Sequence, residues 1–358
     1  MLHLGTRKGL FTLRDREIER VSFLGVPVTA VLPAADGTLY AAVGHGHFGA
    51  KLHRSRDQGR NWEEVAAPRW PARPEGLDER DPVRGTQTSW SLNLIWVLEE
   101  GAAAGSLWCG TIPGGLFHSE DSGASWTFVR SLWDRPERKQ WFGGGYDQPG
   151  IHSVCVDPRD ARKITLGVSC GGVWHSADSG ETWETRSKGM YAAFMPPERR
   201  EDPAIQDPHR VAQCKAAPEV LWAQHHNGVF RTEDGGKLWT ELHVPPSSFG
   251  FAVAAHPRDP LTAWFVPAVK DELRVPVDGK LVVSRTRDGG KTFEQLHAGL
   301  PQSHAYDLIY RHALDVDASG ARLAMASTTG SLWTSLNSGD AWLCLSHHLP
   351  PVYCVRWS

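Results

Sequence analysis

The sequence predicts an all-β fold, a seven-bladed β-propeller of four-stranded antiparallel blades, and three observations lead to that prediction. A short turn motif recurs six times along the 358 residues. Strand-like segments keep a fixed distance from the copies of this motif, and the two ends of the chain each supply part of one more unit. Because the motif recurs from one end to the other, we expect residues 1–358 to form a single propeller domain.

The motif has the form S/T-x-D/N-x-G-x-x-W/F and joins two strands of each predicted blade. By chance it should appear roughly 0.03 times in a chain of this length. Its copies lie roughly 50 to 65 residues apart, which is the spacing of propeller blades that carry insertions. The six copies occupy residues 55–62, 119–126, 176–183, 232–239, 286–293 and 335–342.

Each element of the motif has a physical role in a tight turn. The carboxylate can accept hydrogen bonds from backbone N–H groups of its own turn. The glycine permits the positive φ that such a turn needs, and the aromatic residue packs between neighbouring sheets. We therefore interpret the acidic residues of the motif as structural groups and not as catalytic ones.

Further strands precede each copy of the motif. Segments that begin 11 positions before the motif Asp or Asn read as strand, turn, strand, for example residues 167–174. Before these come apolar segments such as 151–156, 251–255 and 314–316, each followed by a turn. One unit therefore has four strands, A to D, and the motif joins strand C to strand D.

The ends of the chain supply the seventh blade. Residues 5–11 match the turn between strands B and C, and residues 18–24 match strand D, but no strand A precedes them. Residues 352–357 form an apolar strand that belongs to no other blade. Pairing this strand with the N-terminal ones would remove two exposed edges, so we expect the C-terminal strand to close the propeller.

The composition argues against several kinds of partner. A formal net charge of −3 and an isoelectric point near 6.6 give no reason to expect nucleic acid or a membrane surface as a partner. No apolar run approaches the roughly 18 residues of a membrane helix, and residues 1–7 lack the features of a signal peptide. The six cysteines include no C-x-x-C pair and indicate free thiols in a reducing compartment. We therefore expect a cytoplasmic protein.

With these motifs the chain resembles the Asp-box, or bacterial neuraminidase repeat, superfamily of β-propellers, which includes sialidases, sortilin-type receptors and photosystem assembly factors. More narrowly, it is similar to bacterial sialidase-like or "glycosyl hydrolase" repeat proteins, most of which have no established activity. The resemblance covers essentially the whole chain and implies the propeller fold. The segments that carry the narrower likeness are residues 5–11, 152–158, 207–209 and 311–315.

The sequence does not predict a typical sialidase. The resemblance implies that a sialidase would need three arginines for the sialate carboxylate, a tyrosine nucleophile with a glutamate partner, and an acidic aspartate. The N-terminal part of this chain lacks the Arg-Ile-Pro segment that usually carries the first arginine. Sialidases also normally have six blades, whereas this sequence predicts seven.

A site is expected on one face of the propeller. The D–A connections and the B–C turns share a face in blades of this topology, and long connections are usually functional or disordered. All four long connections of this chain fall on that face, so we expect a pocket there, over the central channel. These connections are residues 67–89, 131–150, 188–207 and 268–279.

The predicted acid/base centre combines His152 and His209, which open the inner strands of adjacent blades. An imidazole with a pKa near neutrality can give or take a proton at working pH, and the carboxylates of Asp207 and Asp307 could orient it or act beside it. Bonding to neighbouring loop carbonyls is the alternative role for both histidines. Residues expected to contact the substrate, including two arginines suited to an anionic group, are Arg274, Arg311, His304, Tyr306 and Arg7.

A divalent metal such as zinc is a further hypothesis for this face. His45, His47, His225 and His226 lie in B–C turns, and an H-x-H spacing can present two imidazoles to one ion. Hydrogen bonds between loops are the alternative role for these four histidines.

Three classes of function remain open. The first is a hydrolase or lyase acting on a carbohydrate or another small molecule, with the site in a funnel on the D–A/B–C face. The second is a non-catalytic propeller that binds a protein partner as an assembly or scaffold factor. The third is a purely structural propeller. A deep polar funnel would favour the enzyme, and a flat aromatic face made of Trp70, Trp90, Trp133 and Trp141 would favour a protein partner.

Overall fold

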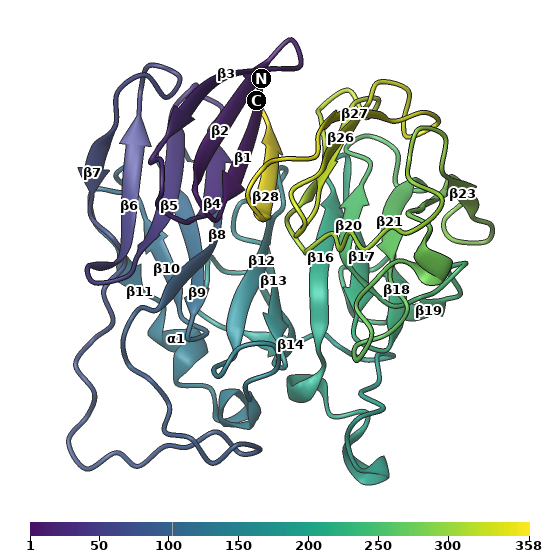
Figure 1. Ribbon diagram of the computed structural model, residues 1–358. Coiled ribbons are helices and arrows are strands. Elements are labelled where there is room, and N and C mark those ends of the chain that lie inside the picture. The colour runs from purple at the N-terminus through teal and green to yellow at the C-terminus, as the bar shows by residue number, and fades with distance from the viewer. Residues whose placement is uncertain (102) are drawn as a thin grey trace. The chain divides into compact units, whose positions relative to one another are not determined.

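The fold is a seven-bladed β-propeller, seen in a computed structural model that describes residues 1–101 and 103–358 (Figure 1). Each of the seven sheets has four antiparallel strands. Apart from one short α-helix and four 3-10 helices, the regular elements of the described residues are all strands. The predicted fold class, blade number and strand number per blade are therefore confirmed.

We number the blades along the chain and give their strands in the order A to D. Blade 1 has β28 (Val352–Trp357), β1 (Leu2–Thr6), β2 (Gly9–Arg14) and β3 (Glu17–Ser22). Blade 2 has β4 (Val28–Pro33), β5 (Leu39–His45), β6 (Gly49–Ser55) and β7 (Glu63–Val65). Blade 3 has β8 (Leu94–Glu100), β9 (Leu107–Ile112), β10 (Leu116–Ser119) and β11 (Thr127–Phe128). Blade 4 has β12 (Gly150–Val156), β13 (Ile164–Ser169), β14 (Gly172–Ser176) and β15 (Glu184–Thr185).

The remaining blades follow the same order. Blade 5 has β16 (Pro208–Cys214), β17 (Ala217–His225), β18 (Gly228–Thr232) and β19 (Thr240–Leu242). Blade 6 has β20 (Gly250–Ala255), β21 (Ala263–Pro267), β22 (Val283–Thr286) and β23 (Glu294–Leu296). Blade 7 has β24 (Leu314–Val316), β25 (Leu323–Ala326), β26 (Leu332–Ser335) and β27 (Leu343–Ser346).

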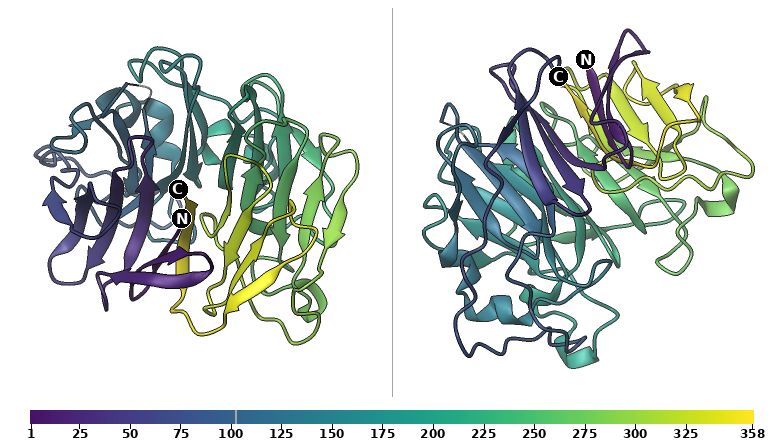
Figure 2. Two further views of the ribbon diagram at one scale, coloured as in Figure 1. Left: turned by 90° about the horizontal axis from the view of Figure 1, so that it is seen from above. Right: turned by 60° about the vertical axis from the view of Figure 1, so that its left-hand side comes forward.

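The C-terminal strand completes the first blade. β28 pairs antiparallel with β1, and Leu4 lies opposite Val355 in that ladder. The amino group of Met1 donates a hydrogen bond to the carbonyl oxygen of Ser358 at 2.7 Å, and the two chain ends lie side by side in both figures (Figures 1 and 2). The predicted closure of the propeller by residues 352–357 is confirmed.

The chain divides into two compact units, which we describe separately. The first contains blades 1, 6 and 7, most of blade 5 and strand β4, and it comprises Met1–Pro33, His209–Gly235 and Trp239–Ser358. Its largest core cluster buries Leu4, Trp264, Trp333 and Val355, which come from blades 1, 6 and 7. Side chains from the inner faces of successive sheets thus fill this core with large apolar groups.

The second unit contains blades 3 and 4 and strands β5, β6 and β7 of blade 2, and it comprises Ala34–Pro208 and Gly236–Leu238. Its main core cluster includes Trp108, Trp174 and Trp183, all of them buried. Trp183 is the aromatic residue of a motif copy, and the structure buries it as the sequence predicts. The single domain expected for residues 1–358 stays a prediction.

The motif forms a self-contained turn, which we call the repeat turn (residues 55–62 and the five equivalent segments). In blade 4 the Ser176 hydroxyl donates to Asp178 Oδ1 at 2.8 Å and accepts from the Gly180 N–H at 2.8 Å. Asp178 also accepts hydrogen bonds from the Thr182 hydroxyl and N–H, which lower its pKa to about 2. The carboxylate therefore belongs to its own turn.

Short helices interrupt the long connections. They are α1 (Arg130–Trp133), η1 (Pro136–Gln140), η2 (Pro197–Arg199), η3 (Pro203–Ile205) and η4 (Val277–Gly279). None of the helices in the described residues has the length and apolar character needed to cross a membrane. The connection before blade 3, residues 66–93, has no strand or helix.

Candidate functional site

His209 lies on β16, and its imidazole is held in one orientation from two sides. Its Nδ1 lies 2.6 Å from the carbonyl oxygen of Gly250, the first residue of β20. A carbonyl oxygen only accepts hydrogen bonds, so Nδ1 carries the proton and Nε2 has the lone pair of the neutral ring. The imidazole also stacks on Phe251, with ring centroids 4.4 Å apart and ring planes 11° apart. Blades 5 and 6 together fix the tautomer and direction of this buried side chain.

Two arginines share the same aromatic ring. The guanidinium carbons of Arg274 and Arg311 each lie 5.3 Å from the centroid of Phe251, within the range of cation–π contacts. Arg274 comes from the connection between β21 and β22, and its guanidinium pairs with Asp271 at 2.5 Å. We call His209, Phe251, Arg274 and Arg311 the Phe251 group. The structure thus brings together three of the predicted site residues, through a phenylalanine that was not predicted as part of the site.

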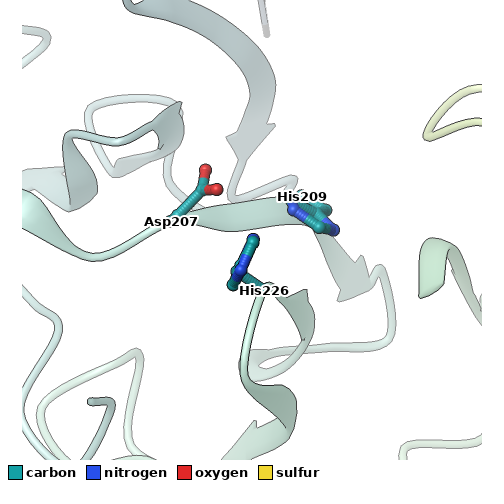
Figure 3. A group of neighbouring side chains, drawn as sticks. All are labelled: Asp207, His209 and His226. Carbon is teal, nitrogen blue, oxygen red and sulfur yellow. The ribbon is translucent and has the colours of Figure 1, made fainter. Parts of the chain in front are cut away.

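His226 and Asp207 lie beside His209 (Figure 3). His226 follows β17, and its ring centroid is 5.5 Å from that of His209, edge to face. Asp207 comes directly before β16, and its Oδ1 accepts hydrogen bonds from the Ser169 hydroxyl at 3.2 Å and the Cys170 N–H at 3.0 Å. One ligand atom from each of Asp207, His209 and His226 lies within 4.8 Å of the other two. Two imidazoles and a carboxylate are a donor set that suits zinc and similar ions.

His152 has a different environment from that of His209. It is fully buried on β12, and its Nε2 lies 2.7 Å from the carbonyl oxygen of Pro208, the residue before His209. Nε2 is therefore the donor, and Nδ1 accepts from the Ser153 hydroxyl at 2.9 Å. These contacts match the alternative role of bonding a neighbouring loop carbonyl. A role of His152 as an acid or base stays a prediction.

Four further predicted catalytic or substrate-binding residues have no hydrogen bond, ion pair or ring contact with the Phe251 group in the described part of the chain. They are Asp307, Arg7, His304 and Tyr306. Asp307 accepts hydrogen bonds from the hydroxyls of Ser327, at 2.7 Å, and Thr329, which orders a turn of blade 7. Arg7, His304 and Tyr306 are exposed. Their predicted contacts with a substrate stay predictions.

The four histidines predicted to bind a metal have separate surroundings. His226 belongs to the group with Asp207 and His209. Nδ1 of the neighbouring His225 accepts a hydrogen bond from the Asn227 N–H at 3.0 Å, within its own turn. His45 packs edge to face on Phe48, and His47 is exposed. Among the described residues, the one group with metal-ligand geometry contains only one of these four histidines, together with two residues that were predicted as catalytic.

Three of the four tryptophans proposed as a flat aromatic face, Trp70, Trp90 and Trp133, pack against one another instead, and Trp141 packs edge to face on Trp174. Trp70 meets Trp133 edge to face with ring centroids 4.7 Å apart, and Trp90 meets Trp133 in the same way at 5.5 Å. Trp133 and Trp141 are each only 3% exposed. These rings form a small core under the connections of the second unit, so they do not present a flat face to a partner.

Sequence reasoning missed Phe251 as the centre of the site. Its position was visible as the start of a predicted inner strand, next to Gly250 and two residues after Phe249. Phe249 packs edge to face on both His209 and Phe251. Tyr310 also packs edge to face on Phe251, with ring centroids 5.4 Å apart. A cluster of aromatic residues at the starts of inner strands was the available signal.

Comparison with known proteins gives distant likenesses. No protein-family model matches the chain. A curated protein of Neosartorya fischeri, named "probable oligoxyloglucan-reducing end-specific xyloglucanase", is 23% identical over 358 residues, covering 90% of this chain and 39% of that protein. The oligoxyloglucan-reducing end-specific xyloglucanase of Emericella nidulans is 25% identical over 267 residues, covering 66% of this chain and 30% of that protein. The chain therefore spans less than half the length of these curated relatives.

Solved structures share the fold at low identity. The GH74 xyloglucanase from Xanthomonas campestris matches with a TM-score of 0.65 and 17% identity, over 97% of this chain and 52% of that one. YCF48 from Cyanidioschyzon merolae matches with a TM-score of 0.58 and 16% identity, over 94% and 91%. YCF48 bound to a D1 peptide matches with a TM-score of 0.54 and 14% identity, over 96% and 84%. At these identities the likeness shows the propeller fold alone.

Proposed function

We propose that this chain is a carbohydrate-active enzyme, of the hydrolase or lyase type, that acts on a saccharide bearing a carboxylate. The observation that carries the proposal is the Phe251 group, in which an oriented imidazole and two guanidinium groups meet on one aromatic ring. The names of the curated relatives, both xyloglucanases, support a saccharide as the substrate class. The carboxylate on the saccharide is inferred from the two arginines.

In this proposal His209 gives or takes the proton. With Nδ1 bonded to Gly250, the lone pair of Nε2 is the group that can accept a proton. Arg274 and Arg311 bind the carboxylate with their planar donors. In an elimination they neutralise the carboxylate and acidify the adjacent C–H. The imidazole removes that proton, a C=C bond forms, the glycosidic C–O bond at the β carbon breaks, and the leaving oxygen takes a proton from the imidazolium or from water. In a hydrolysis the imidazole takes a proton from water while the water oxygen attacks the anomeric carbon, the glycosidic C–O bond breaks, and the leaving oxygen is protonated. His152 acts through the Pro208 carbonyl as a positioning residue.

Mass spectrometry of the products tests both reactions. The full chain is incubated with neutral xyloglucan oligosaccharides and with oligosaccharides that contain uronic acid, because hydrolysis adds one water to the products and elimination adds none. We expect turnover of the acidic set, and His209→Gln should lower kcat by roughly 10²- to 10⁴-fold. His243→Gln, an exposed histidine after β19, is the matched control and should leave the rate unchanged. Equal rates for wild type and His209→Gln would refute the proposal.

A metal-assisted version of the site is the second candidate, and the observation that favours it is the group of Asp207, His209 and His226. The bond from His209 Nδ1 to a backbone carbonyl is the outer contact that commonly orients a metal-ligating imidazole. A bound zinc ion would supply Lewis acidity. Metal analysis of protein purified without chelator or tag metal decides between the versions: stoichiometric zinc, lost in His226→Ala, supports the metal, and its absence leaves His209 as the acid/base.

A protein-binding function is the remaining alternative. Two comparisons favour it. The match covers 91% of the YCF48 chain from Cyanidioschyzon merolae but only 52% of the GH74 xyloglucanase chain. A second YCF48 structure contains a bound D1 peptide. If wild type and His209→Gln both turn over none of the saccharides, and neither binds them, this alternative replaces the enzyme.

Two wider assignments belong to the same proposal. We propose that the chain is a member of the Asp-box superfamily. The six repeat turns support this, as does the Ser or Thr to Asp hydrogen bond shared by all five Asp-containing copies. We also propose a cytoplasmic location, which is supported by six free cysteines, five of them buried. Localisation of a tagged full chain tests the second assignment, and retention outside the cytoplasm would overturn it.

A further inference from the structure

At two blade junctions a pair of large cross-strand neighbours, one on strand B and one on strand C, forms hydrogen bonds with the repeat turn of the following blade. On blade 2 this pair is Tyr40 and Arg54. Both donate hydrogen bonds to the carbonyl oxygen of Ser122, in the repeat turn of blade 3, at 3.3 and 2.9 Å. The pair thus joins the two blades by satisfying a carbonyl of the turn.

Blade 6 repeats the arrangement. Its pair is Trp264 and Arg285, and both donate to the carbonyl oxygen of Ser338, in the repeat turn of blade 7, at 2.9 and 2.7 Å. Ser338 holds the same place in its turn as Ser122, directly before the motif glycine. A large pair and a full repeat turn therefore occur together at both junctions.

The junction between blade 7 and blade 1 departs from this arrangement on both sides. The pair on blade 7 is Ala324 and Thr334, two small residues. The facing C–D turn of blade 1 is the two-residue hairpin Asp15-Arg16, with φ values of 49° and 74°, and it lacks the motif. Neither side therefore supplies a large cross-strand pair or a full repeat turn at this junction.

A cavity of about 340 Å³ lies at this junction, wholly within the first unit. Its size is in the range of small-molecule sites. The apolar part of its wall is made by Leu2, Leu13, Leu336, Leu345 and Trp357, and Thr334 also lines it.

The charged part of the wall is cationic. Arg14, Arg16 and Arg322 line the cavity with one acid, Asp15. Arg14 pairs with Glu19 at 3.1 Å, and Arg322 pairs with Asp317 at 2.7 Å.

Two of the three arginines are thus engaged by acids outside the cavity wall. Arg16 has no salt-bridge partner among the described residues. Arg322 also lies over the indole of Trp357, 5.0 Å from its ring centroid, which joins the cationic and apolar parts of the wall. The cavity combines apolar surface with one uncompensated guanidinium.

We propose that this junction cavity binds a small amphipathic carboxylate, with its hydrocarbon chain along the leucines and Trp357 and its carboxylate on Arg16. The apolar wall selects for a chain of several methylene groups, and the guanidinium selects for an anion. The cavity is formed by blades 7 and 1, and the proposal does not depend on the Phe251 group.

Isothermal titration of the full chain with octanoate tests the proposal. We expect one octanoate per chain, bound at least about tenfold more tightly than octanol, which has the chain without the charge, or acetate, which has the charge without the chain. From butanoate to octanoate, each added methylene should strengthen binding up to about fourfold.

Variants locate the binding. Arg16→Ala should weaken octanoate binding by about tenfold or more, because it removes the uncompensated cation. Arg60→Ala is the matched control, since Arg60 is also an exposed arginine in a C–D turn but lies in the full repeat turn of blade 2. Leu336→Glu changes a side chain that is 54% exposed, so folding should survive while the new carboxylate repels the ligand.

A variant that fills the cavity tests why it is open. Ala324→Trp combined with Thr334→Arg gives blade 7 the same residue pair as blade 6 and should abolish binding. Equal affinity for octanoate and octanol, equal affinity for octanoate and acetate, or unchanged octanoate binding in both Arg16→Ala and Leu336→Glu would each overturn the proposal. If the filling variant fails to fold, Leu336→Glu alone decides.

Discussion

The repeat turns and the Phe251 group are built over very different distances along the chain. In a repeat turn the partners lie within eight residues, and Ser176, Asp178 and Gly180 satisfy one another. In the Phe251 group, His209 reaches Gly250, 41 residues away, and Arg311 comes from beyond blade 6. A local turn depends on its own sequence, whereas the Phe251 group exists only when neighbouring blades are packed.

This difference shows which side chains are available for function because they are not engaged in their own turn. In five of the six turns the side-chain oxygen of the motif Asp or Asn accepts a hydrogen bond from the backbone of its own turn, so the recurrence of Asp along the chain says little about chemistry. The side chains that meet on Phe251 come from different blades and are not part of the repeat.

Removing residues 351–358 should have the largest effect on stability, because it deletes β28 and leaves β1 with β2 as its one remaining partner strand. Val352 and Val355 are fully buried, so the loss should be on the order of 5 kcal/mol, and the deletion also exposes the edge of β1. Thermal unfolding of the shortened chain checks this. An unchanged melting temperature would show that the long-range closure contributes nothing.

Mild acid should weaken the same closure before it weakens the repeat turns. His3 on β1 contacts the Thr12 and Ser358 hydroxyls, and burial lowers its pKa to about 4 from an ordinary 6.5. The folded state therefore binds this proton more weakly than the unfolded chain. The stability from neutral His3 is complete above pH 6.5 and is lost as the pH falls from 6.5 to 4, by at most about 3 kcal/mol.

The repeat turns respond at lower pH. Asp178 has its pKa lowered to about 2 from 3.8, so the stability it contributes is complete above 3.8 and lost as the pH falls to 2. Denaturant titrations across this range in wild type and His3→Gln separate the two steps. A variant that still loses stability between pH 6.5 and 4 as the wild type does would rule out His3 as the cause.

Ser176→Ala should cost roughly 1 to 2 kcal/mol, because the buried hydroxyl donates to Asp178 and accepts from the Gly180 N–H. Ser176→Thr is the matched control, since two repeat turns of this chain have Thr at that position. Chemical denaturation measures both. If the alanine variant is as stable as the threonine variant, the hydroxyl does not hold the turn.

Arg274→Ala should have the smallest effect on stability, within about 0.5 kcal/mol, because the side chain is 38% exposed in a connection. Its effect on the binding of an acidic saccharide should be large, roughly tenfold or more, because one of the two guanidinium groups on Phe251 is lost. Melting and binding are measured on the same preparation. Unchanged binding would remove Arg274 from the site.

The repeat turns, the four-strand unit, the number of blades and the closure by residues 352–357 could all be predicted from the amino-acid sequence. These features follow from local hydrogen bonding, from glycine at fixed turn positions, and from edges that cannot stay unpaired. The sequence also predicted that His209, Arg274 and Arg311 lie near one another, because the repeat register puts all three among the connections and inner-strand starts of one face.

Three features of side-chain packing could not be predicted in this way. These three side chains meet on Phe251, and His226 rather than His45 or His47 lies beside His209. Trp70, Trp90 and Trp133 of the second unit pack against one another. The cavity at the junction of blades 7 and 1 could not be predicted from the sequence either. Each of these depends on how side chains from separate blades pack in three dimensions. Residue spacing fixes the strand and the face of a side chain, but the partner it meets on the next blade is set by packing.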